Sequence, residues 1–296
     1  MTNQPKSGAS QAPDWSVCAI SREEFVQLVS EKGVELYRDL PWRNIDDPYA
    51  VLVSEVMLQQ TQVSRVKRYW SRWMELFPTV DALAAADTAT VLEMWQGLGY
   101  NRRALALKRA CEVCSADNGG LLPRTVDELV KLPGIGPATA AGVVAFAYDE
   151  PSVYIETNVR SVFLHELFPD REEVSDKQLV PYAADTCPSR GARAWYYALL
   201  DYGAHLKSQI ANPARRSKHY ARQSKFEGSR REKRSFLLKR VLAAPDGIDL
   251  EELAARLDEH EQQANRGAVD WGLFEAIVSE LIGEGFFRRE GELLIP

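Results

Sequence analysis

The sequence lacks long hydrophobic runs and a cysteine framework, although it is 296 residues long. No apolar run reaches the ~18 residues that a membrane-spanning helix needs. The first fifteen residues are polar and have no hydrophobic segment typical of a secretory signal. With 45% hydrophobic and 26% charged residues, the composition is that of a globular protein. We therefore expect a cytoplasmic protein without a membrane partner.

Cysteine is scarce, and its scatter does not suggest a disulfide framework in a chain of this size. The four cysteines are Cys18, Cys111, Cys114 and Cys187. Cys111 and Cys114 form the one close pair, within a segment that has helical periodicity. Because no second pair of ligands stands beside them, buried helix residues are favoured over a metal site.

Alternation of apolar and polar residues with period two is rare, so the main body is predicted to be nearly all α. Apolar residues instead recur at steps of three and four, and a possible break lies near Gln59–Thr61. Thr79 is a possible N-cap. Helices are predicted over 23–38, 53–77 with that break, 79–87, 88–98, 101–114, 125–132, 137–148, 159–168 and 191–207.

The two ends of the chain differ from this body. Residues 1–20 are predicted to be a disordered or loosely attached tail. The last sixty residues indicate three helices followed by a short hairpin, an order that suits a winged helix. The basic, glycine-containing stretch 226–234 is the predicted boundary. The C-terminal domain either adds contacts to DNA or packs on the body. Its acidic stretch 249–261 argues against a strong recognition helix and favours a packing or partner role.

Positive charge is concentrated in one segment, although the net charge is −6. From His205 to Arg240 there are twelve basic residues, and only Glu227 and Glu232 oppose them. This segment carries +10 and the rest of the chain −16. A local basic surface attracts a phosphate backbone whatever the total charge. A solvated basic helix without a partner is the alternative.

A glycine turn, Leu132-Pro133-Gly134-Ile135-Gly136, stands between two predicted helices. Glycines permit a tight turn with outward N–H groups, and Pro137 is a favoured first helical residue. Exposed N–H groups and the positive end of a helix dipole make a phosphate site. This arrangement would hold DNA without reading its sequence. A plain turn between packed helices remains open.

Two carboxylates are candidates for glycosidic chemistry. Glu156 precedes a predicted helix and follows an apolar pair, so it could stabilise a cationic sugar or cap that helix. Glu55 lies among Val53, Val56 and Met57. If buried, its pKa would rise and it could donate a proton; otherwise it is an ordinary surface residue.

These motifs resemble one family. SEVMLQQTQV (54–63), with PWR and DPYAVLV before it and GLGYNRRALALKRA after it, is similar to the MutY adenine DNA glycosylases. LPGIGPATAAG and IETNVRSVF continue the resemblance in the same order, over roughly residues 38–205. The first block is specific, because the related endonuclease III enzymes carry a different sequence there.

The resemblance implies a mainly α, two-lobed helix-hairpin-helix DNA glycosylase fold over residues 21–225. One lobe would be a six-helix barrel at about 45–160, and the second would come from 21–44 and 161–225. Residues 226–296 would form the linker and the winged-helix-like domain. The partner would be double-stranded DNA that contains a mispair or damaged base, and the protein would be a nucleoid-associated monomer.

The resemblance also implies residue roles. Glu55 would protonate adenine N7 and later activate water. Glu156 would be the second catalytic residue, and Asn158 matches a residue that supports the catalytic carboxylate. Flipping the target base costs stacking energy, which inserted side chains partly offset. The implied wedge residues are Gln60 and Thr61, and Leu98 and Tyr100 belong to the loop whose aromatic ring inserts beside the lesion. The hairpin residues are Gly134 and Gly136. The phosphate contacts are Arg215, Arg216 and Lys218, and the pocket residues are Trp42, Arg43 and Ala138.

Four departures from the family pattern bear on function. Glu156 stands where the family has Asp. Ala138 stands where bifunctional relatives have a Schiff-base lysine, so no lyase activity is expected. After Gly203 the cysteines that bind a 4Fe–4S cluster in relatives are absent, so no cofactor is expected. The C-terminal tail does not resemble the domain that reads 8-oxoguanine in many relatives.

The leading hypothesis is thus a monofunctional DNA glycosylase of base excision repair that removes adenine opposite guanine or 8-oxoguanine. A glycosylase for a different mispaired or damaged base is one alternative, because Ala138 and Glu156 alter the pocket. A non-catalytic DNA-binding paralogue is another. It would keep the hairpin and the basic segment without turnover.

Overall fold

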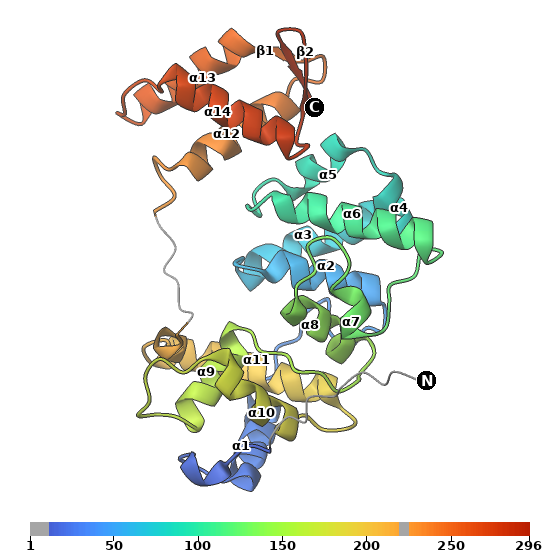
Figure 1. Ribbon diagram of the computed structural model, residues 1–296, viewed down its shortest axis with the longest axis vertical. Helices are drawn as coiled ribbons and strands as arrows, with labels where there is room; N and C mark the ends of the chain where they lie inside the picture. The colour runs from blue at the N-terminus through green and yellow to red at the C-terminus, as the bar shows by residue number, and fades with distance from the viewer. Residues whose placement is uncertain (1–11, 219–224) are drawn as a thin grey trace, which may run out of the picture. The chain divides into compact units, whose positions relative to one another are not determined.

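A computed structural model describes residues 12–218 and 225–296 of the chain. It is nearly all α, as predicted (Figure 1). The chain divides into two compact units built from non-consecutive segments. Of the described residues, the first unit comprises 12–55, 123–131 and 136–218, and the second comprises 56–122, 132–135 and 225–296. In this division residues 45–55, 123–131 and 136–160 fall in the first unit. The predicted lobes, 45–160 and 21–44 with 161–225, stay a prediction.

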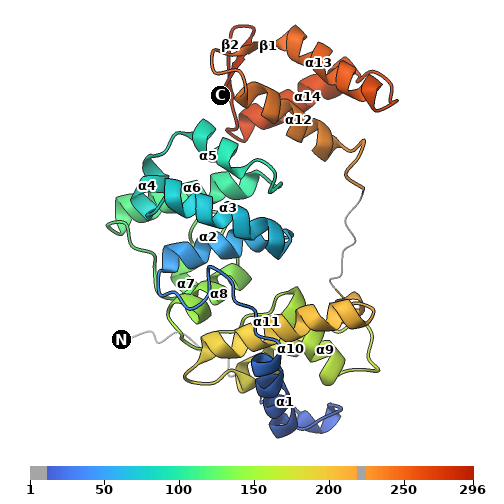
Figure 2. The same ribbon diagram turned by 180° about the vertical axis from the view of Figure 1, so that it is seen from behind.

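Helix α11 organises the first unit, since both α1 and α9 pack on it. Phe25 of α1 meets Phe163 of α9 at 5.0 Å and Trp195 of α11 at 6.2 Å between ring centroids. The elements of this unit are η1 (Trp15–Val17), α1 (Arg22–Glu35), most of α2 (Pro48–Leu58), α7 (Val126–Leu129), α8 (Pro137–Ala147), α9 (Thr157–Glu166), α10 (Asp176–Thr186), α11 (Ala192–Gln209) and η2 (Pro213–Arg216) (Figure 2).

Residues 12–20 are not the loose tail that the sequence predicted. Trp15 packs edge-on against Tyr182, with ring centroids 5.1 Å apart, and its indole Nε1 donates to Asp185 Oδ2 at 3.1 Å. A tryptophan whose ring packs on a neighbour and whose N–H finds an acceptor anchors its segment. The rest of the predicted tail, residues 1–11, lies outside the described residues.

The second unit has a core of large aromatic side chains. Trp73 packs edge-on against Phe77 and Trp95, with centroids 4.9 and 5.3 Å away, and both tryptophans are fully buried. Thr79 caps a helix as predicted, since its side chain accepts from Ala82 N. The helices before the C-terminal domain are the end of α2, α3 (Val63–Leu76), α4 (Val80–Ala85), α5 (Thr88–Trp95) and α6 (Arg102–Asp117).

The C-terminal part has the helix–strand–helix–helix–hairpin order typical of a winged helix, as predicted. Its strands form an antiparallel sheet in the order β1-β3-β2. Glu284 joins this domain to the rest of the unit, because its carboxylate accepts from Arg102 at 2.5 and 2.6 Å. The elements are α12 (Arg230–Leu242), β1 (Ile248–Asp249), α13 (Leu250–Gln263), α14 (Trp271–Gly283), β2 (Arg288–Glu290) and β3 (Leu293–Ile295) (Figure 1). Among the described residues, no helix is both long and apolar enough to span a membrane.

Candidate active site

Glu55 lies on α2 with an apolar surround and a glycine against its carboxyl group. Its helix neighbours Val53, Val56 and Met57 are all buried, while Glu55 itself is only partly exposed. Gly142 of α8 faces the carboxyl group: a Cβ added there would lie 2.4 Å from Glu55 Oε2. The absent side chain of Gly142 therefore leaves the space that the Glu55 carboxyl group occupies.

Tyr154 supplies the hydrogen bond to this carboxyl group. Its hydroxyl donates to Glu55 Oε2 at 3.1 Å, and its ring packs edge-on against Phe146 and Tyr196. Its backbone N–H donates to the Tyr196 hydroxyl at 3.2 Å. The packing holds Tyr154 in place, so the phenol is a fixed partner for Glu55.

The surroundings of Glu55 raise its pKa to about 8. Desolvation is the main cause, because burial penalises the charged carboxylate. The Tyr154 hydrogen bond lowers the pKa and the negative charge of Glu156 raises it. At neutral pH the carboxyl group therefore retains its proton, as a general acid requires.

Glu156 is the N-cap of α9. Its Oε1 accepts from Asn158 N at 2.5 Å and from Val159 N at 3.1 Å. The predicted capping role is therefore present. Capping and catalysis are compatible, since the positive end of the helix is a favourable place for a carboxylate charge. Glu156 also lies close enough to Glu55 to act on its pKa electrostatically; that the two carboxylates share one catalytic site stays a prediction.

Lys207 of α11 contacts the residues around Glu156 and was not singled out from the sequence. Its Nζ donates to Asn158 Oδ1 at 2.7 Å. Glu156 favours its charged form, but desolvation outweighs this and lowers the pKa of Lys207. One turn earlier, a Cβ on Gly203 would lie 2.2 Å from the Asn158 carbonyl oxygen. The signal in the sequence was the Gly203–Lys207 spacing, which places both residues on one helix face.

The glycine turn has the predicted backbone. Gly134 has φ +73°, a conformation that glycine adopts readily, and a Cβ there would lie 2.4 Å from Ala106 Cβ. Gly136 is the N-cap of α8 and Pro137 is its first residue. Gly134, Gly136 and Ala138 are exposed, so this segment is accessible to a ligand.

Part of the chain matches a known protein family. Residues 53–198 match the model of the HhH-GPD superfamily of base excision DNA repair proteins. The chain carries an HhH-GPD domain. Two solved structures share its fold: a thermostable thymine-DNA glycosylase (24% identity, TM-score 0.55, 62% of this chain and 86% of that one) and a non-covalent endonuclease III–DNA complex (21%, 0.56, 64% and 90%). The predicted fold class is confirmed.

Similar sequences are named adenine DNA glycosylase. The protein from Mycolicibacterium smegmatis is 43% identical over 169 residues, which are 56% of this chain and 58% of that protein. The protein from Mycobacterium tuberculosis H37Rv is 45% identical over 127 residues, covering 43% and 42%. That from Mus musculus is 41% identical over 134 residues, covering 42% and 26%. The predicted likeness to the MutY family is confirmed, and the matches span about half the length of the first two relatives.

Two loops of the HhH-GPD domain carry the predicted wedge residues. Gln60 and Tyr100 both have positive φ, +55° and +50°, which is uncommon for side chains of this size. Tyr100 is 41% exposed, whereas Leu98 is 3% exposed. Thr61 Oγ1 donates to the Leu98 carbonyl oxygen at 3.4 Å, so the structure brings these two loops together. Their contact with DNA stays a prediction.

Other predicted DNA and pocket residues have partners within the protein. Arg216 donates to the carbonyl oxygens of Leu164, Phe168 and Pro169. Arg43 forms a buried ion pair with Asp201, with both Nη–Oδ distances at 2.7 Å. These contacts give Arg43 and Arg216 structural roles. Arg215 and Lys218 are exposed and Trp42 is buried; roles for all five predicted residues in binding stay predictions.

The residues present do not fit a 4Fe–4S cluster. The segment 203–218 contains no cysteine, and thiolates are the ligands that hold such clusters. Cys111 and Cys114 are both fully buried on α6, and desolvation raises the pKa of the Cys111 thiol to about 12. The prediction that these two cysteines are buried helix residues is confirmed.

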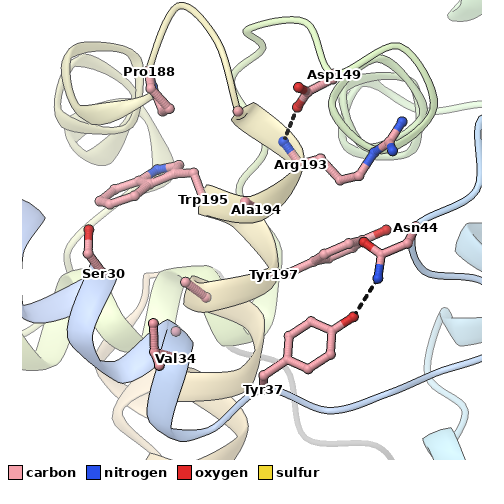
Figure 3. Close-up of a pocket in the computed structure, with 13 residues that line it drawn as sticks. Ser30, Val34, Tyr37, Asn44, Asp149, Pro188, Arg193, Ala194, Trp195 and Tyr197 are labelled. Atoms are coloured by element: carbon pink, nitrogen blue, oxygen red, sulfur yellow. Dashed lines mark hydrogen bonds between the residues drawn. The ribbon is translucent and has the colours of Figure 1, made fainter.

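A pocket of about 540 Å³ lies in the first unit, at the start of α11. Figure 3 shows Asp149 accepting from the backbone N–H of Arg193 and Asn44 donating to the Tyr37 hydroxyl, at 2.8 Å each. Its lining residues do not include Glu55, nor Glu156 with its neighbours Asn158 and Lys207. It is therefore separate from the candidate active site.

Proposed function

We propose that the chain is a monofunctional DNA glycosylase that removes adenine from a mispair with guanine or 8-oxoguanine. The observation that carries the proposal is the Glu55 carboxyl group, which packs against Gly142, accepts from the Tyr154 hydroxyl and lies in surroundings that raise its pKa to about 8. A carboxyl group that retains its proton at neutral pH can protonate a departing purine. The adenine DNA glycosylase relatives support adenine as the base removed.

In this reaction each residue has a distinct task. Glu55 transfers its proton to adenine N7, so the base leaves as a neutral molecule when its bond to C1′ breaks. Glu156 stabilises the oxocarbenium-like sugar electrostatically. The resulting Glu55 carboxylate then takes a proton from the water that attacks C1′, which restores the acid. Asn158 and Lys207 hold the Glu156 end of the site.

The proposed specificity and products follow from the same residues. Ala138 offers no amine for a Schiff base, so strand cleavage by β-elimination is not part of the reaction. The DNA partner would contact the exposed turn at Gly134 and Gly136, where backbone N–H groups suit a phosphate. The protein would act as a monomer and without a bound cluster.

Single-turnover assays on matched duplexes test the proposal. The substrates contain A:8-oxoguanine, A:G, T:G and U:G pairs, and alkali treatment reveals abasic sites. Strand cleavage only after alkali, and only on the adenine strand, supports the proposal. Release of a different base indicates another glycosylase specificity. Duplex binding with no abasic product in any substrate indicates a non-catalytic DNA-binding protein.

A further inference from the structure

Arg103, on the first turn of α6, caps the end of the helix that carries Glu55. Its Nη1 donates to the carbonyl oxygens of Val56 at 2.8 Å, Met57 at 3.2 Å and Gln59 at 2.6 Å. The last carbonyl groups of a helix have no partners within it. A guanidinium there satisfies them and complements the negative end of the helix dipole.

The other end of the same guanidinium binds both loops of the predicted wedge. Arg103 Nη2 donates to Thr61 Oγ1 at 3.2 Å, to the Leu98 carbonyl oxygen at 3.2 Å and to the Gly99 carbonyl oxygen at 2.9 Å. Thus one side chain contacts the end of α2, loop 59–61 and loop 98–100. A planar fork with several donors can serve such divergent acceptors, whereas a lysine ammonium cannot match their geometry.

Both loops have a backbone that needs such support. Gln60 and Tyr100 adopt positive φ, which persists only where the surroundings hold it in place. The Arg103 guanidinium carbon lies 5.5 Å from the centroid of the Tyr100 ring and 5.3 Å from that of Trp95. Trp95 Nε1 adds a bond to the Gly99 carbonyl oxygen at 3.0 Å.

We propose that Arg103 is a positioning residue that locks loop 59–61 and loop 98–100 to the end of α2. The two loops then enter the duplex as one wedge when the target base leaves the stack. The inference rests on the proposed glycosylase function, because it explains how base extrusion is coupled to the helix of Glu55. Weakening the contacts of Arg103 would therefore impair base extrusion more than it impairs binding to a duplex in which no base has to leave the stack.

Arg103→Lys is the test, with Arg102→Lys as the matched control, since Arg102 is on the same turn but pairs with Glu284. Each full-length protein is mixed with two duplexes: one carries 2-aminopurine beside the target adenine, and the other carries a tetrahydrofuran abasic analogue. Extrusion is measured as the 2-aminopurine fluorescence rise, base release as the single-turnover rate, and binding as Kd. Thermal unfolding verifies that the variants are folded.

For R103K we expect the extrusion signal and the rate to fall about 10-fold or more, with Kd for the abasic-analogue duplex within about 3-fold of the parent. R102K should match the parent. A parent-like extrusion signal in folded R103K, or an equal loss of affinity for both duplexes, would overturn the inference. If R103K does not fold, Trp95→Phe replaces it; this variant removes one bond to loop 98–100 and should reduce extrusion. If the parent releases no base, the proposed function fails, and extrusion and Kd still decide the role of Arg103.

Discussion

Lys207 Nζ donates to Asn158 Oδ1 at 2.7 Å, and the Asn158 backbone N–H donates to the Glu156 carboxylate at 2.5 Å. A cation on α11 is thus linked through one residue to the carboxylate proposed to stabilise the sugar cation. A hydrogen bond to a charged group is worth about 1.5–3 kcal/mol, enough to affect how firmly Asn158 is held.

Replacing Lys207 therefore tests whether this link matters. Lys207→Met should lower the single-turnover rate by roughly 10- to 100-fold, the range that 1.5–3 kcal/mol corresponds to. Lys207→Arg should recover part of the rate, because it restores a charged donor. Lys177→Met, the same change at an exposed lysine of α10 outside the basic segment, is the control. A K207M rate equal to that of K177M would show that the link is dispensable.

Tyr154→Phe should move the pH profile of base release. The hydroxyl of Tyr154 lowers the pKa of Glu55, so its removal raises that pKa above about 8. The acid is lost as pH rises through the Glu55 pKa, and the alkaline limb of the rate should therefore shift to higher pH. The measurement is the single-turnover rate from pH 6 to 10. An unmoved limb, or one shifted to lower pH, would argue against Glu55 as the titrating acid.

The pKa of Glu55 also predicts how stability depends on pH. Its folded-state pKa, about 8, lies above the ordinary glutamate value of 4.5. The folded chain therefore binds more protons than the unfolded chain between these two pH values. This group's contribution to stability is complete below the lower value and falls as pH rises toward the upper one. In denaturant unfolding at pH 5.5 and 8.5, Glu55→Gln should lose less stability than the parent; equal losses would contradict the raised pKa.

Gly142→Ala should disturb the acid directly. The new Cβ would lie 2.4 Å from Glu55 Oε2 and 3.0 Å from Tyr154 Cε2, so the carboxyl group must move. We expect a loss of about 1–3 kcal/mol in the free energy of unfolding, as for other overpacked sites, together with loss of base release. Gly283→Ala, which meets no atom within 4 Å, should change neither. Parent-like activity in G142A would mean that the observed position of Glu55 is not required.

Local features of the fold were predictable from the sequence because they depend on neighbouring residues. The helical break near Gln59–Thr61 separates α2 from α3, and Thr79 was identified as a cap from its position before an apolar pattern. Helix α10 was missed: Pro181 lies inside it, and an internal proline ordinarily argues against a helix. The grouping of α7 and α8 with the first unit depends on packing between distant segments.

The site was only partly predictable for the same reason. Periodicity placed Glu55 among apolar residues, but its burial depends on Gly142, which is distant in the sequence. Lys207 was counted only as one residue of the basic segment, and Arg103 stood unremarked within the motif GLGYNRRALALKRA. Nothing local shows which acceptors a long flexible side chain will reach. Asp201, which pairs with Arg43, was hidden in the same way.

The role of Glu55 as the acid is tested most directly by the single-turnover rate of Glu55→Gln on an A:8-oxoguanine duplex, measured with Kd for the same duplex. The amide keeps the shape of the side chain but cannot donate the proton. We predict a rate at least about 100-fold below that of the parent, as expected for loss of a general acid, with Kd within about 3-fold. A folded E55Q protein that releases adenine at the parent rate would contradict the assignment of Glu55 as the acid.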